Sequence, residues 1–229
     1  MILFLLATLL SGCTQRLWLT NNFDAVKSDI DTVSIILPHV EYTIIDGESR
    51  TINNAFGMLT SINVAAVLKE TINEGNFIAK TAIYMCDSTF INDWLSKHFV
   101  NSTKIYHRIV DSLQRSKNEE RIFPLTPELQ LLVDQVKSRH FIFVDGIAFG
   151  TTEDSKRFDL LQAETFKLFY DRPYIYDFQW SGLQLRIFMI ETKSKKVIWS
   201  NYNTNKDSKY NPLRNQGIKD LCIKLLKEK

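Results

Sequence analysis

The side chains suited to acid–base or metal chemistry are few and widely separated in this sequence. The histidines are His39, His98, His107 and His140. His98 and His107 are nine residues apart, which is not the one-turn spacing of a pair of metal ligands on a helix. We therefore expect each histidine to be a surface or strand-end residue, and we expect no metal site. Asp145 could act as a general base only with a partner acid that the sequence does not identify.

No motif of a familiar catalytic class accompanies these residues. The sequence lacks a Gly-x-Ser-x-Gly elbow, a Walker A loop, a His-Glu-x-x-His helix and a Cys-x-x-Cys pair. The segment 145–150 follows an apolar run but lacks the Gly-x-Gly-x-x-Gly spacing of a phosphate-binding turn, so we expect it to continue a strand or bend at its edge. The motifs thus predict no catalytic residue and no cofactor.

The overall composition is that of a globular protein. The chain has 229 residues, 45% of them hydrophobic, with 28 basic and 26 acidic side chains and a formal net charge of +2. This composition excludes collagen-like, largely disordered and disulfide-scaffold classes. Because no basic stripe is present, we expect no nucleic-acid partner.

The N-terminus carries a signal-like segment. Residues 2–10 are apolar but fall short of the about 20 residues that span a bilayer. They lead into Leu10-Ser11-Gly12-Cys13, which resembles a bacterial lipobox. The resemblance implies that residues 1–12 are a lipoprotein signal peptide, that Cys13 carries lipid, and that residues 13–31 form a lipidated tether.

The lipid predicts where the protein resides. Several acyl chains on Cys13 give durable membrane anchoring. Thr14 follows the cysteine, and the absence of Asp there favours the outer membrane by resemblance to sorting rules in enteric bacteria. We therefore expect a lipid-anchored protein on the periplasmic face of the outer membrane. Cys222 is predicted to be a buried apolar side chain, and a disulfide between Cys86 and Cys222 is left open.

Strand-like and helix-like patterns alternate through the rest of the chain. Short β-branched or alternating runs predict strands at 32–37, 77–85, 141–144, 182–190 and 197–202, and spacings of three and four predict helices at 54–73, 90–95, 105–113, 127–136 and 218–226. This order predicts an α/β (α+β) fold with a mixed central sheet flanked by helices, a C-terminal β-hairpin and a closing helix. Residues 32–229 are expected to form a single domain.

An aromatic-rich insertion is predicted near residues 151–180. Its first half has the pattern of a helix, and its second half holds Tyr170, Tyr174, Tyr176, Phe178 and Trp180. Exposed aromatic clusters mark interfaces. We expect these five residues to bind a partner, with the alternative that they cover the insertion's own core.

The order of these features carries a family resemblance. A lipobox, a strand ending at Pro38, and the hairpin from Glu191 to Trp199 resemble the periplasmic lipoprotein superfamily that includes the CsgG curli-secretion lipoprotein, the LpoB activator of peptidoglycan synthase and the TolB N-terminal domain. The resemblance covers residues 32–150 and 181–228. It implies action by assembly and contact, without catalytic residues.

Three functions follow from these observations. The leading one is a non-enzymatic accessory or scaffold protein in cell-envelope assembly that contacts a protein partner of unknown identity, with a homo-oligomer left open. The second is a ring-forming secretion-channel lipoprotein, for which residues 139–150 and 168–192 would supply lipid-facing strands. The third is a hydrolase of envelope polymers that uses Asp145, Asp177 or a histidine.

Overall fold

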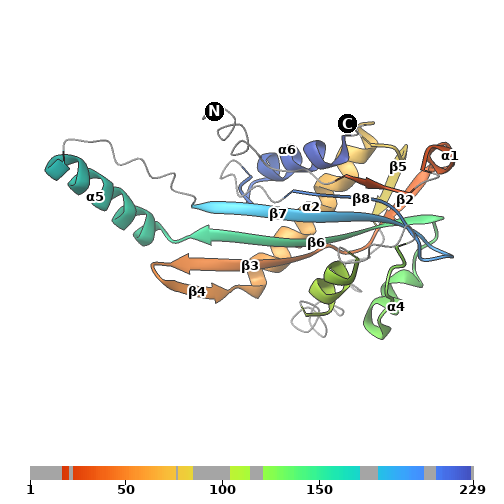
Figure 1. Ribbon diagram of the computed structural model, residues 1–229, viewed down its shortest axis with the longest axis horizontal. Coiled ribbons are helices and arrows are strands. Elements are labelled where there is room, and N and C mark those ends of the chain that lie inside the picture. The colour runs from red at the N-terminus through yellow and green to blue at the C-terminus, as the bar shows by residue number, and fades with distance from the viewer. Residues whose placement is uncertain are drawn as a thin grey trace, which may run out of the picture.

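A computed structural model describes residues 17–20, 23–75, 77–84, 104–113, 121–170, 180–203 and 210–227. Figure 1 shows their arrangement. The elements are β1 (Trp18–Leu19), α1 (Phe23–Lys27), β2 (Thr32–Ile35), β3 (His39–Asp46), β4 (Ser49–Ile52), α2 (Asn54–Asn73), β5 (Thr81–Tyr84), α4 (Pro127–Val133), β6 (His140–Thr151), α5 (Glu153–Tyr170), β7 (Ser181–Glu191), β8 (Val197–Tyr202) and α6 (Asn215–Leu226), with a further helix at 104–113. The helix expected at 90–95 lies outside the described residues, as do Cys13, Cys86 and His98.

The described strands form one mixed sheet. Its order is β1-β8-β7-β6-β2-β5, and β3 and β4 continue the sheet beside the second half of β6. β6 pairs in parallel with β2 and β3, whereas β6–β7 and β7–β8 are antiparallel. The predicted mixed sheet, C-terminal hairpin and closing helix are confirmed.

β2 and β3 act as two halves of one long strand. Ile35 pairs with Ile142 and His39 pairs with Asp145, so both strands follow β6 on either side of Pro38. Proline has no N–H to donate to the ladder, which accounts for the break. The sequence pattern predicts that the strand ends at this proline, whereas the structure adds β3 and β4 after it. These two strands form a hairpin around Gly47, whose φ of 58° is a left-handed conformation that glycine adopts without strain.

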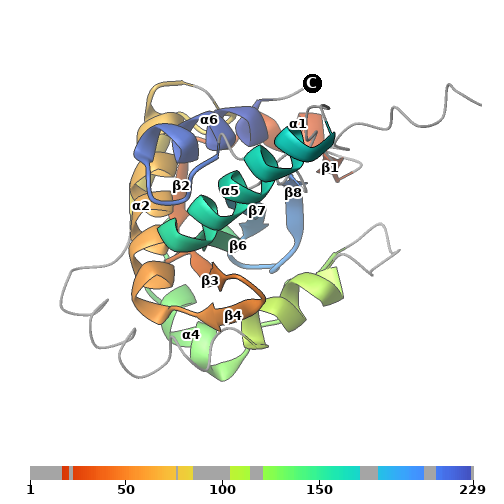
Figure 2. The ribbon, with the colours of Figure 1, turned by 90° about the vertical axis from the view of Figure 1, so that its left-hand side faces the viewer.

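Helices cover both faces of the sheet at one end of the molecule. On one face, α2 and α6 pack against side chains of β6 and β7 such as Val144 and Leu185. On the other face, the helix at 104–113 and α4 pack against Phe141, Phe143 and Phe188. Figure 2 shows α2 and α6 on one side of the strands and α4 on the other. Side chains along β6 alternate between the two faces of the sheet, so this strand contributes to two separate hydrophobic cores.

α2 spans the residues predicted for it. The Asn53 side chain caps the helix by accepting a hydrogen bond from the Phe56 N–H at 2.9 Å, and Gly75 follows the helix with a φ of 80°. Among the described helices, α2 is long and apolar enough to cross a membrane, but half of its apolar window is buried in the fold. Its buried side chains, Leu68 and Ile72 among them, belong to the core shared with the sheet, as in the core helix of a globular domain.

The folded unit begins earlier than the expected boundary at residue 32. Trp18 and Leu19 pair with β8 as the edge strand of the sheet, and Phe23 and Ile30 are buried. The predicted tether of 13–31 is therefore corrected: residues 17–20 and 23–31 belong to the fold because they pair with and pack against it. Cys222 is buried on α6 as expected, and burial raises the pKa of its thiol.

Candidate binding site at the open end of the sheet

Beyond the helices that cover it, one face of the sheet forms a groove. The groove has a volume of about 580 Å³ and is lined by Thr43, Ile45, Arg50, Ile52, Ile147, Ala148, Phe149 and Gln184. All of these residues belong to β3, β4, β6 and β7. The groove is thus built on a rigid sheet rather than on loops, which favours a site of fixed shape.

The chemistry of the groove is apolar with one cation at its wall. Ile52 and Ile147 are exposed large apolar side chains, and Arg50 pairs across the β3–β4 hairpin with Ile45. Phe149 faces Gly182 on β7, where an added Cβ would lie 2.5 Å from the phenylalanine ring. Gly182 is therefore required at this position, because any side chain there would displace Phe149.

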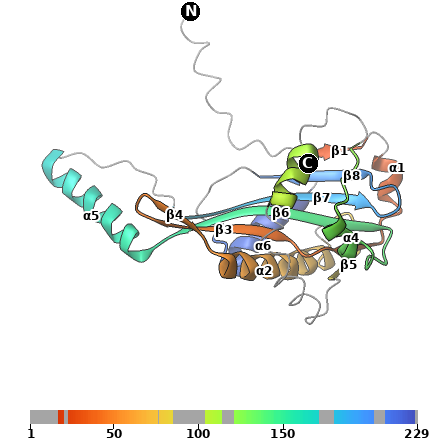
Figure 3. The same ribbon diagram turned by 90° about the horizontal axis from the view of Figure 1, so that it is seen from below.

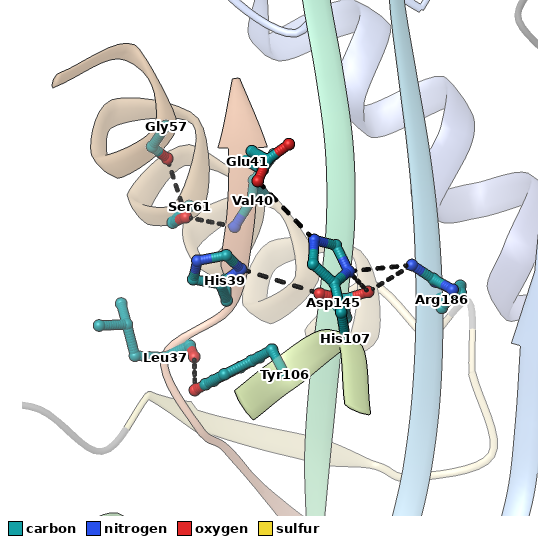
Figure 4. A network of polar contacts seen from close by, with 10 residues as sticks. All are labelled: Leu37, His39, Val40, Glu41, Gly57, Ser61, Tyr106, His107, Asp145 and Arg186. Carbon is teal, nitrogen blue, oxygen red and sulfur yellow. Dashed lines mark hydrogen bonds and ion pairs between the residues drawn. The ribbon is translucent and has the colours of Figure 1, made fainter. Parts of the chain in front are cut away.

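A cluster of polar side chains adjoins the groove on the same face of the sheet. Its central residue, Asp145, precedes Ile147 by two positions on β6. Asp145 on β6 lies between His39 on β3 and Arg186 on β7, because the strand register places these three residues side by side. The Arg186 guanidinium nitrogen Nη2 is 2.7 Å from Asp145 Oδ2, and His39 Nδ1 is 3.8 Å from Asp145 Oδ1. Figure 4 shows the three side chains converging between the strands.

The helix at 104–113 adds His107 to this cluster. Its Nδ1 lies 3.6 Å from Asp145 Oδ2, and its Nε2 lies 3.9 Å from Glu41 Oε2. Tyr106 beside it donates a hydrogen bond to the Leu37 carbonyl at 3.2 Å and stacks on Phe143 with ring centroids 4.7 Å apart. The cluster therefore joins this helix to β3, β6 and β7.

The electrostatics of the cluster keep Asp145 ionised. Burial alone would raise the pKa of Asp145, but the nearby nitrogens of His107 and His39 and the charge of Arg186 lower the pKa below its usual value. The same carboxylate, 3.6 Å from the His107 ring nitrogen, raises the pKa of His107, against an opposing effect of burial. The site thus holds a buried negative charge matched by neighbouring cations.

This arrangement holds neighbouring elements together and does not present a reactive carboxylate to the groove. The Asp145 side chain is 0% exposed, so a substrate in the groove cannot reach its oxygens. Within the described ranges, no three His, Cys, Asp or Glu side chains lie close enough to hold a metal ion. The cluster holds His107 and Glu41 beside the groove. Both side chains are partly exposed.

α5 leaves the sheet at this same end. Asp46 in the β3–β4 turn accepts hydrogen bonds from Thr152 and Ser155 at 2.8 and 3.0 Å, and Gly47 N–H donates to Ser155 Oγ at 2.7 Å. These bonds lower the pKa of Asp46 and fasten the first turn of α5 to the hairpin. Beyond that turn the helix projects away from the body (Figure 1). Phe158 and Leu161 on it are 59% and 61% exposed.

His39 and His140 are strand-end residues, as predicted, because each begins a strand; both are buried. Burial, followed by the charge of Arg139, lowers the pKa of His140, which favours a neutral ring. His107 lies beside Asp145, and the burial of Asp145 keeps its oxygens out of reach of a substrate.

The aromatic residues predicted to bind a partner are mostly outside the described part of the chain. Tyr174, Tyr176 and Phe178 lie there, and so does the side chain of Tyr170, whose backbone ends α5. Trp180 is half-buried, and its carbonyl accepts a hydrogen bond from Thr151 N–H at 2.7 Å, which closes the base of the insertion. The predicted helical first half of the insertion is confirmed as α5.

Arg50, Glu41 and Arg186 are site residues that were not predicted from the sequence. Arg186 and Asp145 are each a charged residue within an otherwise apolar strand, and this pattern could have indicated both as site residues. The chain matches no protein-family model, no curated protein and no solved structure.

Proposed function

We propose that this protein is a lipid-anchored, non-enzymatic accessory or scaffold protein on the periplasmic face of the bacterial outer membrane. It acts in cell-envelope assembly by contacting a partner protein. Cys13 in its lipobox-like tetrad supports the anchor. The resemblance to the CsgG, LpoB and TolB N-terminal superfamily remains a prediction from the sequence.

One observation carries the proposal of protein contact: several large apolar side chains at one end of the molecule are exposed. They belong to α5, β4, the start of α2 and the outer half of β6: Ile52, Phe56, Leu59, Ile147, Phe158, Leu160 and Leu161. Phe158 and Leu161 are three residues apart and share one face of α5, and exposed apolar patches mark interaction sites. At the same end, the groove offers a preformed apolar surface with Arg50 at its wall, which suits an apolar segment of a partner that carries a carboxylate.

The hydrolase alternative is disfavoured by the burial of Asp145, and Asp177 lies outside the described residues. The channel alternative needs lipid-facing strands at 139–150 and 168–192. β6 and β7 do pair along these segments, but residues 168–170 are helical and α2 and α6 pack on one face of the pair. Neither alternative is favoured by a specific observation.

The test is site-specific photo-crosslinking in living bacteria. A photoreactive residue replaces Phe158, Leu161 or Ile52, and the matched control replaces Lys69, an exposed residue on α2. We expect crosslinks to one discrete envelope protein from the three test positions and none from Lys69. Crosslinks to a further copy of this chain, together with a closed oligomer by native mass spectrometry, would replace the proposal with the channel function. No crosslink from any of the three positions would refute it.

A further inference from the structure

The connection between the lipid site and the folded body is very short. Only Thr14, Gln15 and Arg16 separate Cys13 from Leu17, and Leu17 packs against the core while Trp18 and Leu19 pair with β8. Four Cα steps span at most about 14 Å. If Cys13 carries lipid, as the proposed function requires, β1 must therefore stay within that distance of the bilayer surface.

The surface on one side of β1 is basic. The Arg121 guanidinium lies over the Trp18 ring, 4.6 Å from its centroid. The Arg121 carbonyl accepts a hydrogen bond from Val197 N–H at 2.8 Å, and Ile122 forms a bridge with Lys196. Arg121 and Lys196 are thus held beside the same edge of the sheet.

The surface on the other side of β1 carries the basic end of α6. Asn201 on β8 donates a hydrogen bond from Nδ2 to the Leu225 carbonyl at 2.7 Å, which fixes the last turns of α6 next to the strand that pairs with β1. Figure 3 shows α6 together with α2 on one face of the sheet. Lys224 lies in the last turn of α6, and Lys227 is the residue that follows the helix.

A further observation fits a membrane as the occupant. Leu19 and Ile122 are 38% and 61% exposed on this edge, although they are large apolar side chains. Lys and Arg beside exposed apolar side chains are typical of a surface that rests on anionic headgroups.

We propose that the β1 edge, defined by Leu19, Arg121, Ile122, Lys196, Lys224 and Lys227, is a membrane-contacting surface that binds anionic phospholipid headgroups. This proposal rests on lipidation of Cys13. The edge sets the orientation of the protein on the membrane, because the lipid alone would leave the body free to rotate about its anchor.

The experiment measures how well each lysine is protected from a membrane-impermeant amine reagent. Full-length lipidated protein is reconstituted in vesicles of phosphatidylcholine with phosphatidylglycerol, in vesicles of phosphatidylcholine alone, and in detergent micelles. Peptide mass spectrometry then reads the labelling of Lys196, Lys224 and Lys227 against Lys69 and Lys104, which are exposed on α2 and on the helix at 104–113. We expect labelling of the three edge lysines to fall about fivefold in the anionic vesicles alone, while the two controls keep their labelling.

A charge-reversal variant distinguishes headgroup binding from steric shielding of the lysines by the nearby bilayer. Lys196→Glu should increase labelling of Lys224 and Lys227, whereas the matched variant Lys69→Glu should leave them protected. Equal labelling of edge and control lysines in anionic vesicles would overturn the proposal. The intact mass of the same samples reports lipid on Cys13, so a chain without lipid refutes the proposed function, whereas a lipidated chain with an unprotected edge refutes only this inference.

Discussion

Asp145 links the helix at 104–113 to the sheet through a buried charge. Its charge is fully buried and lies within ion-pair distance of Arg186, His107 and His39. A buried ion pair contributes little over an apolar pair of the same shape, but removing one partner leaves the other charge buried without compensation. The cluster is therefore sensitive to loss of any one member.

We expect Asp145→Asn to lower the free energy of unfolding by about 3–5 kcal/mol, because Arg186 would keep its charge in a partly buried site without a counter-ion. Denaturant unfolding followed by circular dichroism measures the change. Glu41→Gln is the matched control: its carboxylate is partly exposed and 3.9 Å from His107, so its loss should change stability by less than about 1 kcal/mol. Equal stability of the two variants would show that Asp145 is not part of a structural ion cluster.

His107 should make the stability of the protein depend on pH near neutrality. The groups that face it are Asp145, Glu41 and Arg186, and the carboxylate of Asp145 raises the pKa of His107 in the folded state above the unfolded value of about 6.5. A raised pKa contributes stability that is complete below the unfolded pKa and is lost as the pH rises through the folded pKa. We expect the melting temperature of the wild type to fall relative to that of His107→Gln between pH 6 and pH 8.5, because the variant lacks the contribution of His107. An unchanged pH dependence in the variant would contradict the assignment.

The members of this cluster could not be assembled from the sequence. Asp145 stood out as a charge after an apolar run, but its neighbours depend on which residues of β3 and β7 lie opposite it. Register is set by strand pairing across about 100 residues of chain and has no local signature. In β7, the alternation of polar and apolar residues correctly predicts that Leu185 and Ile187 face the core with α2 and α6, while Arg186 points to the opposite face.

At the scale of elements, α5 is joined to the body by hydrogen bonds at its first turn. Asp46 accepts from Thr152 and Ser155, and so links the β3–β4 turn to the start of the helix. We expect Asp46→Ala to speed amide hydrogen exchange at Gly47 and Ser155, whose N–H groups bond within this network, without affecting α2. Exchange measured by mass spectrometry tests this. Unchanged exchange at both amides would show that other contacts hold the helix.

The exposed stripe of α5 should contribute to binding and little to stability. Phe158→Ser with Leu161→Ser removes apolar groups that are already in water, so the free energy of unfolding should change by less than about 0.5 kcal/mol. Leu221→Ala on α6 is the control, because Leu221 is fully buried and its loss should cost about 2–5 kcal/mol. We expect the α5 variant to lose crosslinking to its partner from Ile52 while it melts like the wild type. A large loss of stability would show that these side chains belong to a core.

Elements with a complete local pattern were predicted well, and those that depend on distant pairing were not. α2 matches its predicted range and α6 and the β7–β8 hairpin match closely, since their apolar periodicity is contained in the segment. β3 was missed because Pro38 was interpreted as the end of a strand, although His39–Asp46 alternates and an Asp-Gly turn follows. β5 is shorter than predicted: Phe77 and Ile78 pack against the core, but pairing with β2 starts only at Thr81.

At the scale of the whole molecule, the short connection to Cys13 would set the position of the body in the lipidated protein that we propose. Inserting ten Gly and Ser residues after Arg16 should let the body leave the bilayer, because such a linker adds about 15–20 Å of average reach. We expect protection of Lys224 and Lys227 to decrease while the lipid on Cys13 is retained. Amine labelling measures the change, and protection that survives the insertion would show that the β1 edge binds headgroups without help from the short connection.

The direction of the strands has a consequence for how the protein meets its partners. β1 is the edge strand of the sheet, so with the β1 edge against the bilayer the strands run along the membrane rather than across it. α5, about 27 Å long, leaves the sheet at the strand ends and therefore extends sideways. In the proposed lipid-anchored protein, α5 would meet its partner by diffusion within the plane of the membrane. Encounters would then depend on how densely the protein and its neighbours populate the membrane, and not on their concentration in the periplasmic volume.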